Sequence, residues 1–179
     1  MSDETTARTL NIFGALALAL TDRITAGAKA VVHLHGNAAS VLVLITNHPG
    51  ESFDTIQRAL GLTHSGAVRL IDKLEAARLV ERRRNENDAR AVTLWATPHG
   101  AQTATTVLAA RAQVLEPLLA RTSNADRKVI TAFLEAALAE LTDNKDRALS
   151  ICRFCEEGRC RPLGCPVENA ASRSNRKER

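Results

Sequence analysis

Apolar residues recur at helical spacing at both ends of the chain. One stripe predicts a first helix from about residue 5 to the region of His33, where Gly36 ends it. A second stripe predicts a helix that begins at a Ser123 cap and continues to about residue 151. Both stripes carry more apolar surface than one small domain can cover. The first stripe is Phe13, Leu16, Ala17, Leu20 and Ile24, and the second is Ile130, Phe133, Leu134, Ala137, Leu138 and Leu141.

Residues 53–74 have the pattern of a helix, a tight turn and a second helix. Gly61 supplies the turn, and Thr63 is a natural N-cap for the second helix. The opposite faces of this second helix differ in character, because one is apolar and the other carries short polar groups and an arginine. A helix that reads a DNA groove requires such a polar face. The inward face is Ala67, Leu70, Ile71 and Leu74, and the outward face is His64, Ser65, Val68, Arg69 and Asp72.

A β-hairpin is predicted next, because two strand-like runs flank a polar turn at residues 85–88. Val92 and Leu94 are expected to point inward. A run of arginines is usually a solvated surface, but beside a helix-turn-helix it favours a DNA-binding wing. After the hairpin, Thr97 caps another helix with Pro98 in its first turn, and that helix is predicted to reach residue 119. The arginines around the tip are Arg82, Arg83, Arg84 and Arg90.

The span from about residue 41 to residue 100 resembles the MarR family of winged-helix regulators. The wing motif Asp-x-Arg followed by Thr-Pro-x-Gly at this distance is specific to that family. The residues that carry the resemblance are Gly61-Leu62-Thr63, Arg69-Leu70-Ile71-Asp72-Lys73-Leu74, Leu79-Val80-Glu81-Arg82, Asp88-Ala89-Arg90 and Thr97-Pro98-His99-Gly100.

The resemblance implies a mainly α fold, a winged helix-turn-helix with a β-hairpin wing and long N- and C-terminal dimerisation helices. The winged-helix domain would span residues 1–151 and hold the DNA-binding core at residues 38–100. Dimerisation helices would lie at residues 5–35 and 101–151. A four-cysteine motif follows at residues 152–168, and the basic tail at residues 169–179 is expected to be disordered.

The resemblance also implies roles for the wing. Arg90 would enter the minor groove, where negative potential is enhanced, and Asp88 would orient it. Val68 is either a plain exposed apolar residue or a contact for a thymine methyl group. The candidate DNA-binding residues are His64, Ser65, Val68, Arg69, Lys73, Arg82, Arg84, Asp88 and Arg90.

Three positions depart from the family pattern. Gln57 stands where a small alanine usually lets the two helices approach closely. Arg78 replaces a helix-ending glycine, at a cost of roughly 1 kcal/mol if the left-handed conformation persists. Ala96 stands where leucine is common. These departures affect the expected docking geometry and leave the fold assignment in place.

The net charge, the first residues and the distribution of the cysteines predict the type of partner and the cellular compartment. The net charge of +4 fits a polyanionic partner. The first nine residues are polar and acidic, unlike a signal peptide, and the longest apolar stretch, residues 41–45, is too short to span a bilayer. The cysteines are clustered rather than spread as in a secreted disulfide scaffold. We therefore expect a cytoplasmic protein.

The four cysteines follow C-x2-C-x4-C-x4-C spacing, which equals that of a retroviral zinc knuckle with Cys160 in place of histidine. Four thiolates this close can wrap one tetrahedral ion, so zinc is the leading prediction. An iron–sulfur cluster is the alternative, since a Cys-Pro step at Cys165 is typical of ferredoxin-type endings. Reactive thiols or disulfides are the third possibility. The predicted ligands are Cys152, Cys155, Cys160 and Cys165.

The predicted function is a sequence-specific transcriptional regulator, a repressor by preference, that binds double-stranded DNA as a homodimer on a near-palindromic operator. By the same resemblance, a small-molecule effector could bind near the dimer helices, where His33 and His35 could meet an anion; the alternative is two surface histidines in a loop. An RNA-binding protein of the zinc-knuckle type is the second function. An enzyme is not expected, because four cysteines close the coordination shell of a metal.

Overall fold

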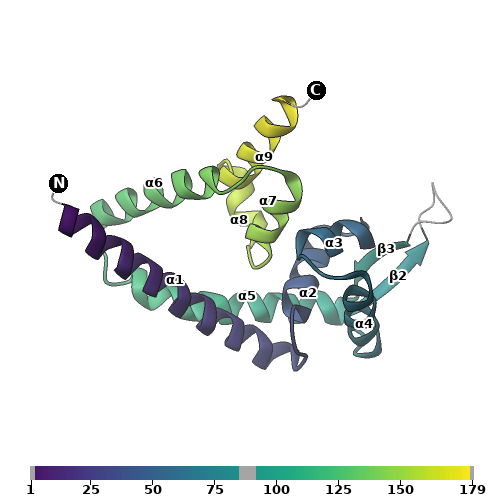
Figure 1. Cartoon of the computed structure of the whole chain (residues 1–179). Helices are drawn as coiled ribbons and strands as arrows, with labels where there is room; N and C mark the ends of the chain where they lie inside the picture. Colours follow the sequence, from purple (N-terminus) through teal and green to yellow (C-terminus); the bar gives the residue numbers. More distant parts are fainter. Residues whose placement is uncertain (1–2, 85–91, 178–179) are drawn as a thin grey trace.

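The computed structural model describes residues 3–84 and 92–177, and it shows a mainly helical chain with one small antiparallel sheet. Figure 1 shows a winged-helix body at one end, from which α1 and α5 extend side by side, while α6 returns as a separate arm. In chain order the elements are α1 (Asp3–Val32), α2 (Ala38–Asn47), β1 (Glu51–Ser52), α3 (Phe53–Ala59), α4 (His64–Ala76), β2 (Val80–Arg84), β3 (Val92–Ala96), α5 (Pro98–Leu119), α6 (Asn124–Glu140), α7 (Lys145–Cys152), α8 (Glu157–Cys160), η1 (Arg161–Leu163) and α9 (Pro166–Lys177).

Helix α2 forms the centre of the core. Every residue from Ala38 to Ile45 is buried, so this helix is covered on all sides. The covering elements are α1 and α5 on one side and α3, α4 and β3 on the other. Because the helix-turn-helix packs directly on α2, its position is fixed by the best-packed part of the molecule.

The wing strands β2 and β3 pair as predicted, and β1, which was not predicted, pairs with the other edge of β3. The register runs from Val80 opposite Ala96 to Arg84 opposite Val92. Leu94 is fully buried, as expected, but Val92 is 38% exposed. The inward expectation for Val92 was wrong because this residue lies at the outer end of the strand, beyond the edge of the core.

The helix expected from Ser123 to about residue 151 is interrupted. Ser123 does begin α6, through a capping box with Asp126, but α6 ends at Glu140. Asn144 then begins α7, since its side chain accepts a hydrogen bond from the Arg147 N–H at 2.8 Å. Leu141 continues the apolar spacing of α6 and masks this cap in the sequence pattern. The break turns the chain back, so that α7 packs on α3 (Figure 1).

Residues 166–177 form α9, and the disordered tail expected for residues 169–179 is wrong over the described part. Val167 is 2% exposed, and α9 packs against α6 and α7. The backbone N–H of Asn169 donates to the Cys165 carbonyl at 3.0 Å in the first turn. The polar composition of this segment does not reveal the tertiary contacts that stabilise it.

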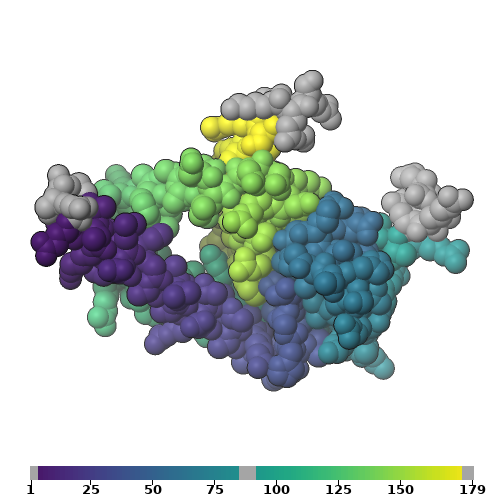
Figure 2. Space-filling model, in the orientation of Figure 1, coloured from purple at the N-terminus to yellow at the C-terminus, as the bar shows by residue number. Residues whose placement is uncertain are grey.

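Many apolar side chains remain exposed on α1, α5 and α6, which are called the extended helices below. None of the α6 residues, all of which the structure describes, is buried. Figure 2 shows an opening between α1 and the α6 arm. None of the described helices combines the length and apolar character needed to cross a membrane. The large exposed apolar side chains on α1, on α5 and along α6 to its C-cap are Leu10, Ile12, Phe13, Leu16, Leu18, Leu118, Leu119, Val129, Phe133, Leu134 and Leu141.

Candidate functional site

The helix-turn-helix consists of two capped helices joined by a short turn. The Ser52 hydroxyl accepts a hydrogen bond from the Thr55 N–H at 3.1 Å and begins α3. The Thr63 hydroxyl accepts one from the Gly66 N–H at 3.1 Å and begins α4. Between the helices Gly61 has φ +60°, a left-handed conformation that glycine adopts without a Cβ clash. The turn and the cap predicted from the sequence are both confirmed.

The two faces of α4 lie as the apolar spacing predicted. Ala67, Leu70, Ile71 and Leu74 are buried against the core. The opposite face is exposed to solvent, with Val68 half-buried at its edge. The Arg69 Nε atom donates to the Ser65 carbonyl at 3.2 Å, so this side chain lies back along the helix. The exposed members of the outward face are His64, Ser65, Arg69, Asp72 and Lys73.

A tight junction joins α4, β2 and α5. Arg78 has φ +57°, so the left-handed conformation typical of a helix-ending glycine persists here with a side chain. The Thr97 hydroxyl donates to the Arg78 carbonyl at 2.7 Å and accepts from the Gly100 N–H at 2.9 Å. A Cβ atom at Gly100 would lie 1.8 Å from the Leu79 carbonyl oxygen. The Thr-Pro-x-Gly motif is therefore a packing requirement, because only glycine allows α5 to begin so close to β2.

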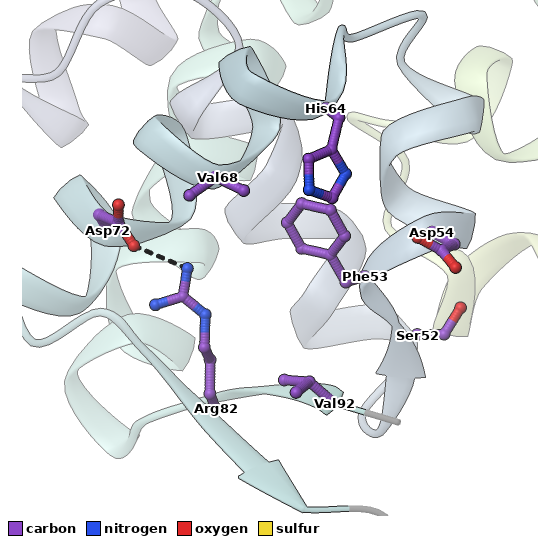
Figure 3. A pocket seen from close by; sticks show the side chains of 8 residues that line it. All are labelled: Ser52, Phe53, Asp54, His64, Val68, Asp72, Arg82 and Val92. Carbon is purple, nitrogen blue, oxygen red and sulfur yellow. Dashed lines mark hydrogen bonds and ion pairs between the residues drawn. The ribbon is translucent and has the colours of Figure 1, made fainter. Parts of the chain in front are cut away.

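A hollow of about 510 Å³ lies between α4, the start of α3 and the wing. Figure 3 shows His64 beside the ring of Phe53 at its upper edge, with a centroid distance of 5.4 Å. The His64 Nδ1 and Gln57 Oε1 atoms are 3.3 Å apart, so Gln57 bridges the two helices by a hydrogen bond where a small residue was expected. Val68 and Val92 line the same hollow.

Arg82 connects the wing to the recognition helix. Its guanidinium pairs with Asp72 at 2.7 Å and with Glu75, and its backbone N–H donates to Glu75 Oε1 at 3.1 Å. Figure 3 shows the side chain reaching from β2 towards Asp72. Two carboxylates neutralise this arginine, so the geometry favours a positioning role over a direct contact with a phosphate.

The remaining wing residues differ in placement. Arg83 pairs with Glu81 and stacks over the Trp95 ring at 4.5 Å from its centroid. Arg84 is exposed at the end of β2. The candidate residues Asp88 and Arg90 lie outside the described residues.

The sequence of residues 34–91 matches the model of the MarR family. The chain carries a MarR family domain. No curated protein matches the sequence at a significant level.

Over 72% to 78% of the chain, the fold is similar to three solved structures, a span longer than the MarR domain. The YusO protein from Bacillus subtilis is 20% identical with a TM-score of 0.64, over 78% of this chain and 98% of that one. MepR, a transcription regulator of the Staphylococcus aureus multidrug efflux pump MepA, is 16% identical with a TM-score of 0.62, over 73% and 96%. A MepR–DNA complex from S. aureus is 18% identical with a TM-score of 0.56, over 72% and 98%. This likeness confirms the predicted winged-helix fold.

The two histidines predicted as weak ligand contacts lie in the loop between α1 and α2. His33 and His35 are both exposed, and His33 has φ +56°. The hollow beside α4 and the cavity at the cysteines are lined by other described residues. The arrangement fits two surface histidines in a loop at least as well as a ligand site.

The four cysteines lie outside the MarR domain and around one cavity of about 580 Å³. Cys152 ends α7, Cys160 ends α8, and Cys165 directly precedes α9, while Cys155 lies in the turn between α7 and α8. All four are free thiols, and Cys160 is the exposed one. Among the described residues, no group of three or more potential ligands is already arranged to hold a metal ion.

The thiols around this cavity differ in acidity. A hydrogen bond from Cys152 stabilises the Cys155 thiolate and lowers its pKa to about 7, against the opposing effect of burial and with support from the nearby Arg111. The same hydrogen bond and burial raise the pKa of Cys152. Burial and the neighbouring thiolates raise the pKa of Cys160. Of these three thiols, Cys155 is therefore the most acidic.

The cysteine segment contacts the MarR domain directly. His48 Nε2 lies 2.8 Å from Glu157 Oε1, and both side chains are largely buried. The Asn47 side chain donates to the Cys155 carbonyl at 3.0 Å. Arg58 on α3 pairs with Asp146 on α7 at 2.9 Å. These contacts leave no signal in the sequence, because the partners are 88 to 109 residues apart and no local pattern relates them.

Proposed function

We propose that the chain is a transcriptional regulator that binds double-stranded DNA as a homodimer. The observation that carries the proposal is the outward face of α4, which is exposed and polar beside the wing, on a helix fixed at its N-terminus by the Thr63 cap. A helix so presented fits the major groove. S. aureus MepR, which has a similar fold, is known in complex with DNA, and this supports DNA as the partner.

The dimer is proposed from the exposed apolar face of the extended helices. Leu10 on α1 is 67% exposed, and Phe133 on α6 is 54% exposed. Contiguous apolar surface of this kind on several helices marks an association surface. A second copy of the chain is the occupant we propose, because α1 and α6 meet at the Phe13 and Phe133 rings, whose centroids are 5.7 Å apart, and then diverge to leave an opening that a partner's helices could fill (Figure 2). Two-fold symmetry would then place two α4 helices about one DNA turn apart, on a near-palindromic operator.

Individual residues receive different roles within this proposal. Ser65 and Arg69, in the N-terminal half of α4, would contact base edges after the Arg69 side chain swings outward. Lys73 would contact a phosphate. Arg82 would hold the wing at a fixed angle to α4 through Asp72 and Glu75. Repression by occupancy of the operator is the expected outcome of such binding.

A titration of the full-length protein with duplex DNA tests the proposal. Duplexes enriched from a random pool are compared with single-stranded RNA, at several salt concentrations. We expect duplex binding whose affinity falls steeply with salt, because phosphate contacts release counterions. Arg69→Ala should weaken binding, whereas the control Arg121→Ala, between α5 and α6, should leave it unchanged. Preference for single-stranded RNA would favour the zinc-knuckle alternative and contradict the proposal.

A further inference from the structure

The fold brings all four cysteines to one place, although they come from three different helix ends and a turn. The cavity that they line also has apolar walls from α6, α7 and α9, including Leu138 and Val167. Soft thiolates beside apolar walls favour thiophilic metals over hard cations.

Two short turns shape the backbone around the cysteines. The Cys155 N–H donates to the Cys152 carbonyl at 2.8 Å, which closes a tight turn between the first pair. Gly164 has φ +86°, and its N–H donates to the Arg161 carbonyl at 3.1 Å, which turns the chain between Cys160 and Cys165. These turns place the four cysteines around one cavity, and their side chains would have to rotate inward to bind one ion together.

We propose that Cys152, Cys155, Cys160 and Cys165 bind one thiophilic metal centre, a zinc ion or a small iron–sulfur cluster, and that this centre controls DNA affinity by docking the cysteine segment on the MarR domain. The segment between α7 and α9 is short and has few apolar residues, so cross-linking by a metal would stabilise its folded form.

The docking contacts explain how the centre would reach the DNA-binding surface. Asn47 and His48 lie at the end of α2, where they bind the Cys155 carbonyl and the Glu157 carboxylate. Arg161 pairs with the same carboxylate at 2.6 Å, so Glu157 lies between the cysteine turn and α2. From His48 the chain continues through β1 into α3. Release of the segment would remove these contacts and loosen the helix-turn-helix, so metal loss should weaken DNA binding.

Metal content is the first measurement, on full-length protein purified without oxygen. Elemental analysis is combined with visible absorption and thiol titration. One zinc per chain in a colourless protein, or iron with acid-labile sulfide in a coloured one, supports the proposal and identifies the centre. Cys160→Ser should lose the metal, whereas Arg159→Ala, an exposed neighbour, should retain it. Absence of both metals with four freely titrating thiols would overturn the proposal.

The second measurement concerns coupling, which rests on the proposed DNA-binding function. Duplex affinity is compared for the purified, chelated and Zn²⁺- or iron-and-sulfide-restored protein, with the helical content checked by circular dichroism. We expect chelation to weaken binding by roughly 5- to 150-fold, with restoration on return of the metal. His48→Ala should keep the metal but show a much smaller response to chelation. Equal affinity of chelated and purified wild-type protein would overturn the coupling. If the metal-loaded protein binds no duplex, the proposed function fails while the metal content stands.

Discussion

The winged-helix body and the extended helices of this chain are built from the same kinds of residue but are packed in opposite ways. In the body Leu42, Ile71 and Leu74 are at most 1% exposed. On the extended helices the apolar stripes are as regular, yet Leu10 is 67% and Leu141 58% exposed. An apolar stripe therefore predicts a buried face without saying which chain buries it. The body is complete within one copy, whereas the extended helices would be complete only with the proposed second copy.

The largest effect is expected from a cavity in the body. Leu74→Ala should lower the free energy of unfolding by about 2–5 kcal/mol, because Leu74 is fully buried and its loss leaves a void in the core. Urea denaturation followed by circular dichroism measures the change. Leu163→Ala is the matched control, since Leu163 is 89% exposed and its truncation should change the stability by less than about 0.5 kcal/mol.

Substitutions on the extended helices should weaken dimerisation rather than folding. Leu10→Asp should weaken the dimer by about 2 kcal/mol or more, because a charge would replace an apolar side chain at the proposed interface. Light scattering across a concentration series measures this change, with Leu163→Asp as the control for an added surface charge. A stable wild-type monomer at micromolar concentration would contradict the proposed second copy and leave the exposed stripes unexplained.

Substitutions on the outward face of α4 should change the affinity for DNA alone. Arg69→Ala should cost about 1–3 kcal/mol in affinity for the preferred duplex if the arginine reads a guanine, with unchanged unfolding and unchanged dimerisation. Lys73→Ala should weaken binding to all duplexes alike and reduce the salt slope by about 1. Fluorescence anisotropy measures both. Wild-type affinity and an unchanged salt slope in both variants would remove α4 from the interface.

The smallest effect is expected at the junction after α4. Arg78→Gly should stabilise the body by about 1 kcal/mol, because Arg78 holds a left-handed backbone conformation that costs a residue with a Cβ atom about this much. Arg78→Ala is the matched control, since it removes the guanidinium and keeps the Cβ atom. Equal stability of the two variants would show that the backbone conformation carries no cost here.

The two regions also differ in how far their structure can be predicted from the sequence. The helix-turn-helix was predicted in detail, because the Thr63 cap and the Gly61 turn are local signals that the structure uses directly. The break at Asn144 was missed, because Leu141 prolongs the apolar stripe of α6 across it. Helix α9 was missed because tertiary packing, in which Val167 is buried, stabilises it.

The sequence indicated which charged residues belong to the site but not how they pair. Arg82, Arg83 and Arg84 were correctly located on the hairpin, but spacing could not show that Asp72 and Glu75 already neutralise Arg82. Residue spacing also could not show that Glu157 pairs with His48, because ion pairs between distant segments produce no periodic pattern in the sequence. Contacts of this kind depend on the tertiary fold and can be seen only in the structure.

The central claim is that two copies of this chain read duplex DNA through α4 and the wing. Selection of bound fragments from a random duplex pool by the full-length protein, followed by sequencing, tests that claim most directly. We expect an inverted repeat whose half-sites are about one helical turn, ~34–36 Å, apart, and we expect the enrichment to weaken with Arg69→Ala. Enrichment of no sequence, or of single asymmetric sites bound by one copy, would contradict the account.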